Sequence, residues 1–301
     1  MTYSSIENES SARVSNNNTE DIMSKKAMLV SLHTSCWTGR VTDKAVGQEV
    51  CVNKLADKKA GNFTKAIIDK NELKQIRSIL SEARTYHNEM TLSWNDQGQR
   101  LLPSSLFSDY TAAIRKLQSD LETEVQEFKK AYPNLVNEAT YWLGDLFERA
   151  DYPDEREIEK KFGLEMEVSP MPASNDFRVQ ISDQEKEQVK KQISQTMEKK
   201  FEKAMKRIWE KIYVAVEKIH KKTSDKDAVF RNSMMKNFKS LVDLLPELNI
   251  TNDEKLTEMT EVLKNQVYDY DPDELRKNKE TRKEAANKTK QILDNLEGLY
   301  V

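Results

Sequence analysis

The stretch HTSCWTGR, residues 33–40, combines the residue types that enzymes use for nucleophilic catalysis. A cysteine attacks a substrate when an imidazole within hydrogen-bonding distance takes its proton, so His33 and Cys36 are the first candidates. Successive side chains of a strand point to opposite faces, and residues three apart therefore face away from each other. His87 or His220 could serve Cys36 instead, but no pattern in the sequence brings either of them near it. We therefore expect no catalytic pair here.

The same stretch also has a structural interpretation. If residues 28–37 are extended, one face carries Met28, Val30, Leu32, Thr34 and Cys36 and is more apolar than the other, which predicts a strand. NFTKAII at residues 62–68 predicts a second strand. Trp37 would anchor the first strand to helices, and Gly39 would form the turn that ends it. We take Trp37 and Gly39 as structural markers, and we expect Trp37→Ala to impair folding before it impairs any chemistry.

The other chemistry-bearing residues form no metal or cofactor motif. The 3 histidines are dispersed, without the HxxxH or HExxH spacings that ligate zinc. The acidic run DYDPDE at residues 269–274 lacks the glycine and the terminal glutamate of an EF-hand loop, and Asp271 followed by Pro272 is typical of a helix start. Each of the 7 glycines stands alone, so no glycine-rich loop cradles a phosphate. The sequence predicts no metal, no cofactor and no enzymatic activity.

Composition favours long, charged helices over a large α/β core. Charged residues make up 33 % of the 301 positions and apolar residues 37 %, with only 7 Gly and 7 Pro among them. The net charge of −3 gives no global attraction to nucleic acid or to an acidic membrane. Cys36 and Cys51 lack a CxxC or zinc spacing, no long apolar run occurs, and the N-terminus lacks the order of a signal peptide. We expect a cytoplasmic protein with two reduced thiols.

Hydrophobic periodicity divides the chain into three parts. Residues 1–25 carry few large apolar groups and predict a disordered tail. Residues 26–181 predict an α+β part, in which two period-2 segments around a Pro-rich loop indicate a β-hairpin near 163–181. Residues 182–301 predict a helical part, with a long helix at 183–222 that begins at a capping box. The predicted fold class is mainly α with a minor β component (α+β), with long antiparallel, coiled-coil-like helices, a short N-terminal strand pair and the central hairpin.

Two predicted helices carry apolar side chains at coiled-coil spacing. In the first, these side chains recur every three or four residues, and Pro133 is expected to end or kink the helix. Its stripe consists of Tyr110, Ile114, Leu117, Leu121, Val125, Phe128 and Tyr132. In the long helix the stripe runs from Val189 to Ile219 without an intervening glycine or proline. A stripe of this length usually packs against another helix, within the chain or in a second copy.

Charge is segregated between two segments of the chain. Residues 184–222 contain 12 Lys or Arg and 6 Glu, a net charge of +6, whereas residues 137–176 have a net charge of −7. A basic helix that also carries Trp209 and Tyr213 could lie along nucleic-acid phosphates. Alternatively, it pairs with acidic helices of its own chain or of a second copy, which the scatter of basic residues around the whole helix favours. The candidate nucleic-acid or partner surface consists of Lys199, Lys203, Lys206, Arg207 and Lys211.

Four stretches resemble an uncharacterised family of proteins encoded by tailed phages and by integrative elements of bacteria. They are SLHTSCWTGR at 31–40, LGDLFERADYP at 143–153, SPMPASNDFRV at 169–179 and KIHKKTSDKDAVFRNSMMKNFKSLVDLLPELNIT at 218–251. The resemblance covers about residue 28 to the end, and its motifs are mostly packing and turn motifs. Members are often encoded near a MoxR-type AAA+ ATPase and a von Willebrand A-domain protein. The resemblance implies a role in the bacterial cytoplasm, beside a protein-remodelling machine or against a host defence, and it implies no catalytic residues.

Two functions from different classes follow from these patterns. The leading hypothesis is a non-enzymatic phage or mobile-element accessory protein that acts by protein–protein interaction. It would be a partner of a AAA+ machine or an inhibitor of a host defence complex, and it would self-associate into a homo-oligomer. The alternative is a DNA-binding accessory protein of phage replication or recombination, which uses the basic helix 184–222. A hydrolase or nuclease that uses Cys36 or an acidic pocket is the most distant hypothesis.

Overall fold

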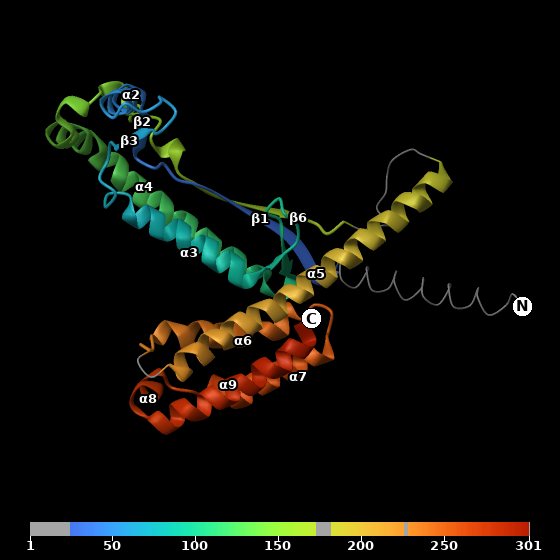
Figure 1. Cartoon of the computed structure of the whole chain (residues 1–301). Helices are drawn as coiled ribbons and strands as arrows, with labels where there is room; N and C mark the ends of the chain where they lie inside the picture. The colour runs from blue at the N-terminus through green and yellow to red at the C-terminus, as the bar shows by residue number, and fades with distance from the viewer. Residues whose placement is uncertain (1–24, 173–181, 226–227, 301) are drawn as a thin grey trace, which may run out of the picture. The chain divides into compact units, whose positions relative to one another are not determined.

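The computed structural model describes residues 25–172, 182–225 and 228–300 (Figure 1). Helix makes up 67 % of the structure and strand 11 %, which confirms the predicted class of mainly α with a minor β component. The predicted disordered tail lies almost entirely outside the described residues, as does the second strand of the hairpin predicted near 163–181. None of the helices within the described ranges is both long and apolar enough to span a membrane.

The described residues form two compact units. Unit 1 contains the described residues of 1–31, 88–110 and 167–301, and unit 2 contains residues 32–87 and 111–166. Each unit therefore combines segments that are far apart in the sequence. Each unit also has a hydrophobic core of its own, so the side chains that position a surface can be examined one unit at a time.

A four-stranded sheet has the strand order β4-β5-β1-β6. Its strands are β1 (Ala27–Ser35), β4 (Leu92–Ser93), β5 (Arg100–Pro103) and β6 (Gly163–Ser169). β5 runs antiparallel to both β1 and β4. The strand predicted at residues 28–37 is present as β1, and the first strand of the predicted hairpin is present as β6. The position of β6 beside β1 is a long-range pairing that alternation within each segment could not indicate.

The strand predicted at residues 62–68 pairs with a strand that the sequence pattern did not reveal. β2 (Arg40–Asp43) and β3 (Phe63–Ala66) form an antiparallel two-stranded sheet. In its register Arg40 lies opposite Ala66. The short strand pair near the N-terminus is thus β2 with β3, whereas β1 belongs to the four-stranded sheet.

The helices of unit 2 include a long one, α4, which supplies much of the core of this unit. They are α2 (Lys44–Asn53), α3 (Lys74–Met90), α4 (Phe107–Leu143) and the 3₁₀ helices η2 (Gly144–Leu146), η3 (Arg149–Asp151) and η4 (Glu159–Lys161). Every residue of the stripe predicted between Tyr110 and Tyr132 is buried, as its spacing indicated. The helix does not end at Pro133 but continues to Leu143.

Unit 1 is a helical assembly around α5. Its helices are the 3₁₀ helix η1 (Ser104–Leu106), α5 (Asp183–Ser224), α6 (Asn232–Leu248), α7 (Glu254–Leu263), the π-helix η5 (Lys264–Tyr268), α8 (Pro272–Lys277) and α9 (Lys279–Tyr300). The predicted capping box is present at the start of α5, where the side chains of Ser182 and Glu185 each accept a hydrogen bond from the other's backbone N–H. The sequence therefore predicted the start of this helix correctly.

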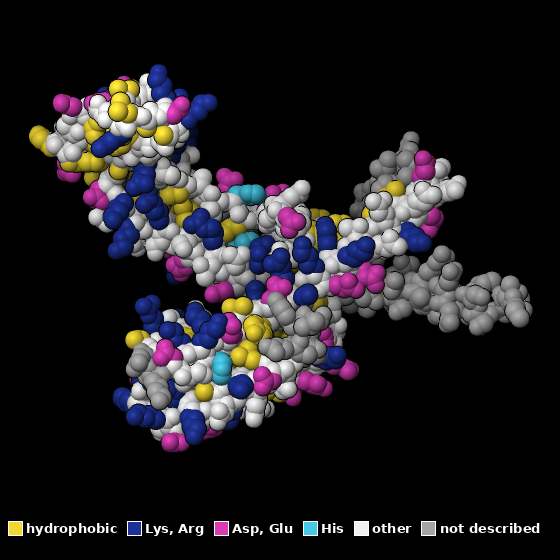
Figure 2. Space-filling view, viewed as in Figure 1, with side chains coloured by type: hydrophobic (Ala, Val, Ile, Leu, Met, Phe, Trp, Pro, Cys, Tyr) yellow, Lys and Arg dark blue, Asp and Glu magenta, His cyan; other side chains and the backbone are white. Residues whose placement is uncertain are grey.

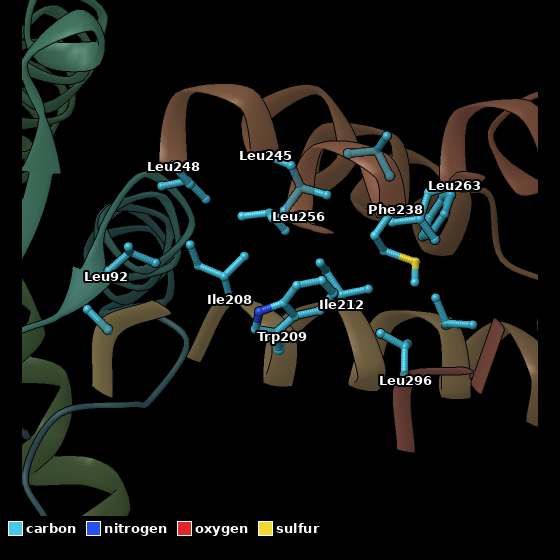
Figure 3. Close-up of a cluster of buried hydrophobic side chains, with 14 of the residues drawn as sticks. Leu92, Ile208, Trp209, Ile212, Phe238, Leu245, Leu248, Leu256, Leu263 and Leu296 are labelled. Atoms are coloured by element: carbon cyan, nitrogen blue, oxygen red, sulfur yellow. The ribbon is translucent and has the colours of Figure 1, made fainter. Parts of the chain in front are cut away.

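The core of unit 1 forms where α5 faces the C-terminal helices. In Figure 3, Ile208, Trp209 and Ile212 project from α5 toward leucine side chains of α6 and α7, among them Leu245 and Leu256. Burial of each such aliphatic side chain contributes roughly 2 kcal/mol to the free energy of unfolding. One face of α5 is thus occupied by the core, and its basic residues must lie on the remaining faces.

Candidate functional sites

His33 and Cys36 lie at the end of β1 and just after it, with different exposure. The side chain of His33 is exposed, whereas Cys36 is half-buried and its Sγ donates a hydrogen bond to the carbonyl of Trp37 at 3.5 Å. The indole of Trp37 packs edge-on against Phe128 at 6.4 Å and Tyr132 at 6.1 Å, measured between ring centroids. The cysteine therefore adjoins an aromatic packing cluster on α4.

Gly39 makes the turn between β1 and β2. Its φ of +64° lies in the left-handed region, which glycine adopts without steric cost. Its carbonyl accepts a hydrogen bond from the backbone N–H of Ile67 at 2.8 Å. A Cβ at this position would lie 3.3 Å from side-chain atoms of both Ile68 and Leu73. The turn thus requires a glycine for backbone conformation and for space.

The acidic residues near 270 serve helix formation. The Oδ1 of Asp271 accepts a hydrogen bond from the backbone N–H of Asp273 at 2.7 Å, and Pro272 is the first residue of α8, as predicted. Within the ranges that the structure describes, no group of three or more His, Cys, Asp and Glu residues could hold a metal ion.

A buried lysine joins two parts of unit 2. The Nζ of Lys65 on β3 lies 3.0 Å from Asp43 Oδ2 and 2.8 Å from Asp151 Oδ2, and it donates to the carbonyl of Leu146 at 2.8 Å. Asp43 is the N-cap of α2, and Leu146 ends η2, which directly follows α4. Lys65 therefore ties the start of α2 to the segment that follows α4.

This ion-paired cluster is structural rather than reactive. The side chain of Lys65 is only 4 % exposed. Asp151 and then Asp43 raise the pKa of Lys65 against the opposing effect of burial. The pKa of the Asp43 carboxyl is lowered, first by the backbone N–H of Val46 and then by Lys65. The ammonium group stays charged, and it is therefore unsuited to act as a nucleophile.

Unit 2 exposes large apolar side chains at the end that Lys65 organises. We call them the apolar tip, which consists of Val50, Val52, Leu55, Tyr141 and Trp142. Leu55 is 97 % exposed, Tyr141 89 % and Trp142 51 %. Figure 2 shows hydrophobic side chains on the part of unit 2 that carries α2. Isolated exposed apolar residues are ordinary, but several large ones at one end of a unit are typical of a contact surface.

Leu55 is exposed on a backbone that disfavours it. α2 ends in a Schellman motif, in which the N–H of Ala56 donates to the carbonyl of Cys51 at 2.8 Å and the N–H of Leu55 donates to that of Val52 at 3.0 Å. This motif places Leu55 at φ +51°, a position that glycine usually occupies. A leucine there costs about 1 kcal/mol in backbone conformation. Because its side chain is almost wholly exposed, the leucine recovers little of this cost by packing within the chain.

Acidic side chains occur near the aromatic part of the apolar tip in the sequence. Glu138 precedes Trp142 by one helical turn on α4, and Asp145 follows Tyr141 by four residues. Both carboxylates are exposed. Residues about one turn apart are neighbours on a helical surface, so Glu138 lies beside Trp142, whereas α4 ends at Leu143 and Asp145 lies beyond it, after Gly144 at φ +52°.

The five basic residues predicted as a nucleic-acid or partner surface all lie on α5, but they differ in their surroundings. The structure leaves Lys199, Lys203, Lys206 and Arg207 exposed, whereas Lys211 is half-buried. The Nζ of Lys203 lies 3.8 Å from Asp96 Oδ1, and this ion pair is weak because both side chains are mostly exposed.

Four basic residues of α5 form one row, and a fifth joins them from the sheet. Lys200, Lys203, Arg207 and Lys211 are spaced by three, four and four residues, which keeps them within roughly 80° around the helix and roughly 16 Å along it. Arg100 is the first residue of β5. We call these five residues the basic surface. Figure 2 shows Lys and Arg side chains gathered over the middle of α5.

Backbone carbonyls at the end of α3 hold two of these cations. The Nζ of Lys211 donates to the carbonyl oxygens of Asn88 at 2.7 Å and Thr91 at 3.2 Å. The Nε of Arg100 donates to Thr91 Oγ1 at 2.6 Å, and its Nη2 donates to the carbonyl of Thr91 at 3.1 Å. The C-terminus of a helix carries partial negative charge, which explains why cations collect here.

The same arrangement places like charges close together. Burial lowers the pKa of Lys211 to about 8, and the positive charge of Arg100 adds to this effect while Glu89 opposes it. Burial also lowers the pKa of Arg100, and Arg207 lowers it further. These three cations therefore destabilise one another in the free protein.

Sequence reasoning missed the apolar tip and the contribution of Arg100. A signal for Tyr141 and Trp142 was present, because they fall outside the buried series of Val136, Ala139 and Leu143 on α4. Arg100 gave no comparable signal, since nothing in its local sequence places it beside a helix about a hundred residues later.

No protein-family model, no curated protein and no solved structure matches this chain. The resemblance to proteins of tailed phages and integrative elements therefore stays a prediction. Function has to be inferred from the apolar tip and the basic surface.

Proposed function

We propose that this chain is a binding protein whose apolar tip docks into an apolar pocket of a different protein. The observation that carries the proposal is Leu55, which is held at φ +51° with its side chain 97 % exposed. Glycine would form the same Schellman turn without the conformational cost. A large apolar side chain that lowers the stability of its own chain is best explained by a contact outside the chain.

The aromatic residues of the apolar tip support the same proposal. Tyr and Trp are enriched among the residues that dominate binding energy, because each buries a large rigid surface at a small entropic cost. Tyr141 and Trp142 are adjacent and both exposed, at the same end of unit 2 as α2. A partner that covers them together with Leu55 would gain an apolar core for its interface.

The charges around the apolar tip indicate the chemistry of the partner. Glu138 lies one helical turn from Trp142, Asp145 follows the end of α4, and both are exposed. Complementary charge at the rim of an interface speeds association and excludes partners of the wrong sign. We therefore propose a partner pocket that is apolar at its centre and rimmed by Lys or Arg.

We propose the partner's identity from the resemblance to proteins of tailed phages and integrative elements. A AAA+ ATPase or a protein of a host defence complex, met in the bacterial cytoplasm, is the occupant that the resemblance implies. A second copy of this chain is the competing occupant, because the long helices also predict a homo-oligomer.

Affinity capture with matched variants tests this proposal. The tagged full-length chain, Leu55→Gly, Trp142→Ala and the control Val214→Ala are used as baits in a bacterial lysate, and captured proteins are identified by mass spectrometry. Val214 is an exposed apolar residue of α5 in unit 1. The affinity of each purified partner for the four proteins is then measured by calorimetry.

We expect a partner whose binding weakens at least about tenfold with Leu55→Gly and with Trp142→Ala but not with Val214→Ala, because tip residues of this kind contribute 1–2 kcal/mol or more. Equal binding of all four proteins by every captured partner would contradict the proposal. A concentration-dependent mass in light scattering that Leu55→Gly abolishes would instead assign the apolar tip to self-association.

A further inference from the structure

The basic surface of unit 1 presents a regular row of cations. Its four members on α5 lie on the flank beside the buried face. Lys203 and Arg207 are exposed and available to a ligand, whereas Lys200 and Lys211 are half-buried and the Nζ of Lys211 is held by backbone carbonyls. Among the described residues, three acidic side chains lie near this row: Asp96, 3.8 Å from Lys203; Glu89, which acts on Lys211; and Glu210, one helical turn after Arg207. The five cations outnumber these acids and leave a positive surface on a chain whose net charge is −3.

The fold fixes the position of this charge. The hairpin of β4 and β5 packs on α5 through Trp94, whose ring lies 5.2 Å from that of Phe201. This contact holds Arg100, which follows the hairpin turn, and the carbonyl of Thr91 binds both Arg100 and Lys211. A preorganised set of cations binds an anion without first losing side-chain entropy.

The mutual repulsion of these cations favours an anionic ligand. Arg207 is exposed, and the charges of Arg207, Arg100 and Lys211 act on one another. A bound anion would compensate this repulsion, since an opposite charge within a few ångströms favours the charged form of each group. Two guanidinium groups near each other also match the bidentate geometry of phosphate oxygens.

We propose that the basic surface binds the sugar–phosphate backbone of double-stranded nucleic acid, without reading its sequence. The row extends over roughly 16 Å, which corresponds to the rise of about five base pairs, so several phosphates of one strand fall within its reach. A single strand is less suited, because it is bound through stacking on exposed aromatic rings. Trp94, whose ring lies 5.2 Å from the Nζ of Lys200, is only 3 % exposed and offers no stacking surface.

This inference is independent of the proposed docking of the apolar tip. The two surfaces belong to different units, and they share no residue. The sequence did not reveal this row, because basic residues occur on all sides of the helix over 184–222. The row occupies only one section of that helix and includes a residue of the sheet.

Fluorescence anisotropy with the full-length chain tests the proposal. The probes are a labelled 20-base-pair DNA duplex, an RNA duplex of the same length and the corresponding single strand, each titrated at several salt concentrations. Lys203→Glu with Arg207→Glu is the test variant, since both side chains are exposed. Lys236→Glu with Lys255→Glu is the control, because these exposed lysines of unit 1 give the same change in net charge.

We expect duplex binding whose logarithmic salt dependence has a slope of about −3 to −4, as for about four neutralised phosphates. The test variant should bind about tenfold more weakly or worse at low salt, with a slope smaller by about two, and the control should bind nearly as the parent does. Comparable binding of DNA and RNA duplexes would show recognition through the phosphates common to both, and preference for one would narrow the ligand to that duplex.

Other outcomes would overturn the proposal. These are absence of duplex binding at low salt, equal weakening by the test and control variants, or tighter binding of the single strand. Displacement of the duplex by poly-glutamate at equal charge concentration would assign the surface to an acidic protein. Lys203→Ala with Arg207→Ala, which carries no new charge, guards against a loss caused by misfolding, and circular dichroism of each variant checks its helix content.

Discussion

Unit 1 and unit 2 each expose groups that lower the stability of the free chain, but by different physical means. In unit 1 the disfavoured feature is electrostatic, because Arg100, Arg207 and Lys211 repel one another. In unit 2 it is conformational, because Leu55 occupies a left-handed position and leaves its side chain in water. A destabilising feature can therefore indicate a binding surface, and repulsion between charges and an unfavourable backbone conformation indicate surfaces for different ligands.

The largest expected effect concerns the cluster that holds the apolar tip in place. Lys65→Met leaves the carboxylates of Asp43 and Asp151 without their buried cation, and it should lower the stability of unit 2 by about 3 kcal/mol. Hydrogen exchange measured by mass spectrometry should show faster exchange in peptides of unit 2 and unchanged exchange in the helices α6 and α9 of unit 1. Equal acceleration in both units would contradict the separation on which the comparison depends.

Trp37→Ala should have the next largest effect. Removing a half-buried indole that contacts Phe128 and Tyr132 should destabilise unit 2 by about 2 kcal/mol, less than a fully buried tryptophan. Urea unfolding followed by circular dichroism measures the change, with Trp142→Ala as the matched control because Trp142 is exposed. If the control destabilised the chain as much as Trp37→Ala, Trp142 would belong to the core and the apolar tip would lose a member.

Alkaline pH should affect the two units in opposite directions. Tyr152 donates a hydrogen bond to the carbonyl of Ile67 at 2.9 Å, and burial raises its pKa to about 12. An unfolded tyrosine has a pKa of about 10, so the stabilisation is complete below pH 10 and is lost as the pH rises to 12. The pKa of Lys211 is lowered to about 8, so its unfavourable burial is relieved between pH 8 and about 10.4, where an unfolded lysine loses its proton.

Midpoints of urea unfolding measured between pH 8 and 12 test the direction of both predicted stability changes. Between pH 10 and 12 the parent should lose more stability than Tyr152→Phe. Between pH 8 and 10 the parent should gain stability relative to Lys211→Met, which has no proton to release. The reverse order in either range would show that the charged form of that residue is favoured in the folded chain.

Regular spacing and capping made much of the fold predictable from sequence. The buried stripe of α4, the capping box of α5 and the Asp271 cap of α8 each depend on residues within a few positions of one another. Local patterns fix such features because helices are built from short-range contacts. By contrast, the pairing of β2 with β3, and of β1 with β5 and β6, is decided by packing between distant segments.

The surfaces were predictable only in part, for the same reason. Sequence pointed to Lys203, Arg207 and Lys211, but Arg100 comes from a different segment that tertiary contacts bring to α5. The exposure of Leu55 could not be predicted from the sequence, because a leucine at the end of an apolar helix is expected to be buried. The structure shows that this side chain is 97 % exposed, on a backbone with positive φ.

The smallest effect tests the central claim most directly, namely that Leu55 serves a contact outside the chain. The free energy of unfolding of Leu55→Gly is measured by urea denaturation beside that of the parent and of Leu55→Ala. Glycine removes the conformational cost but gives the unfolded chain more freedom, so we expect stability unchanged or raised by up to about 1 kcal/mol and above that of Leu55→Ala. A loss of about 1 kcal/mol or more on Leu55→Gly would mean that the side chain packs within its own chain, and it would contradict the account.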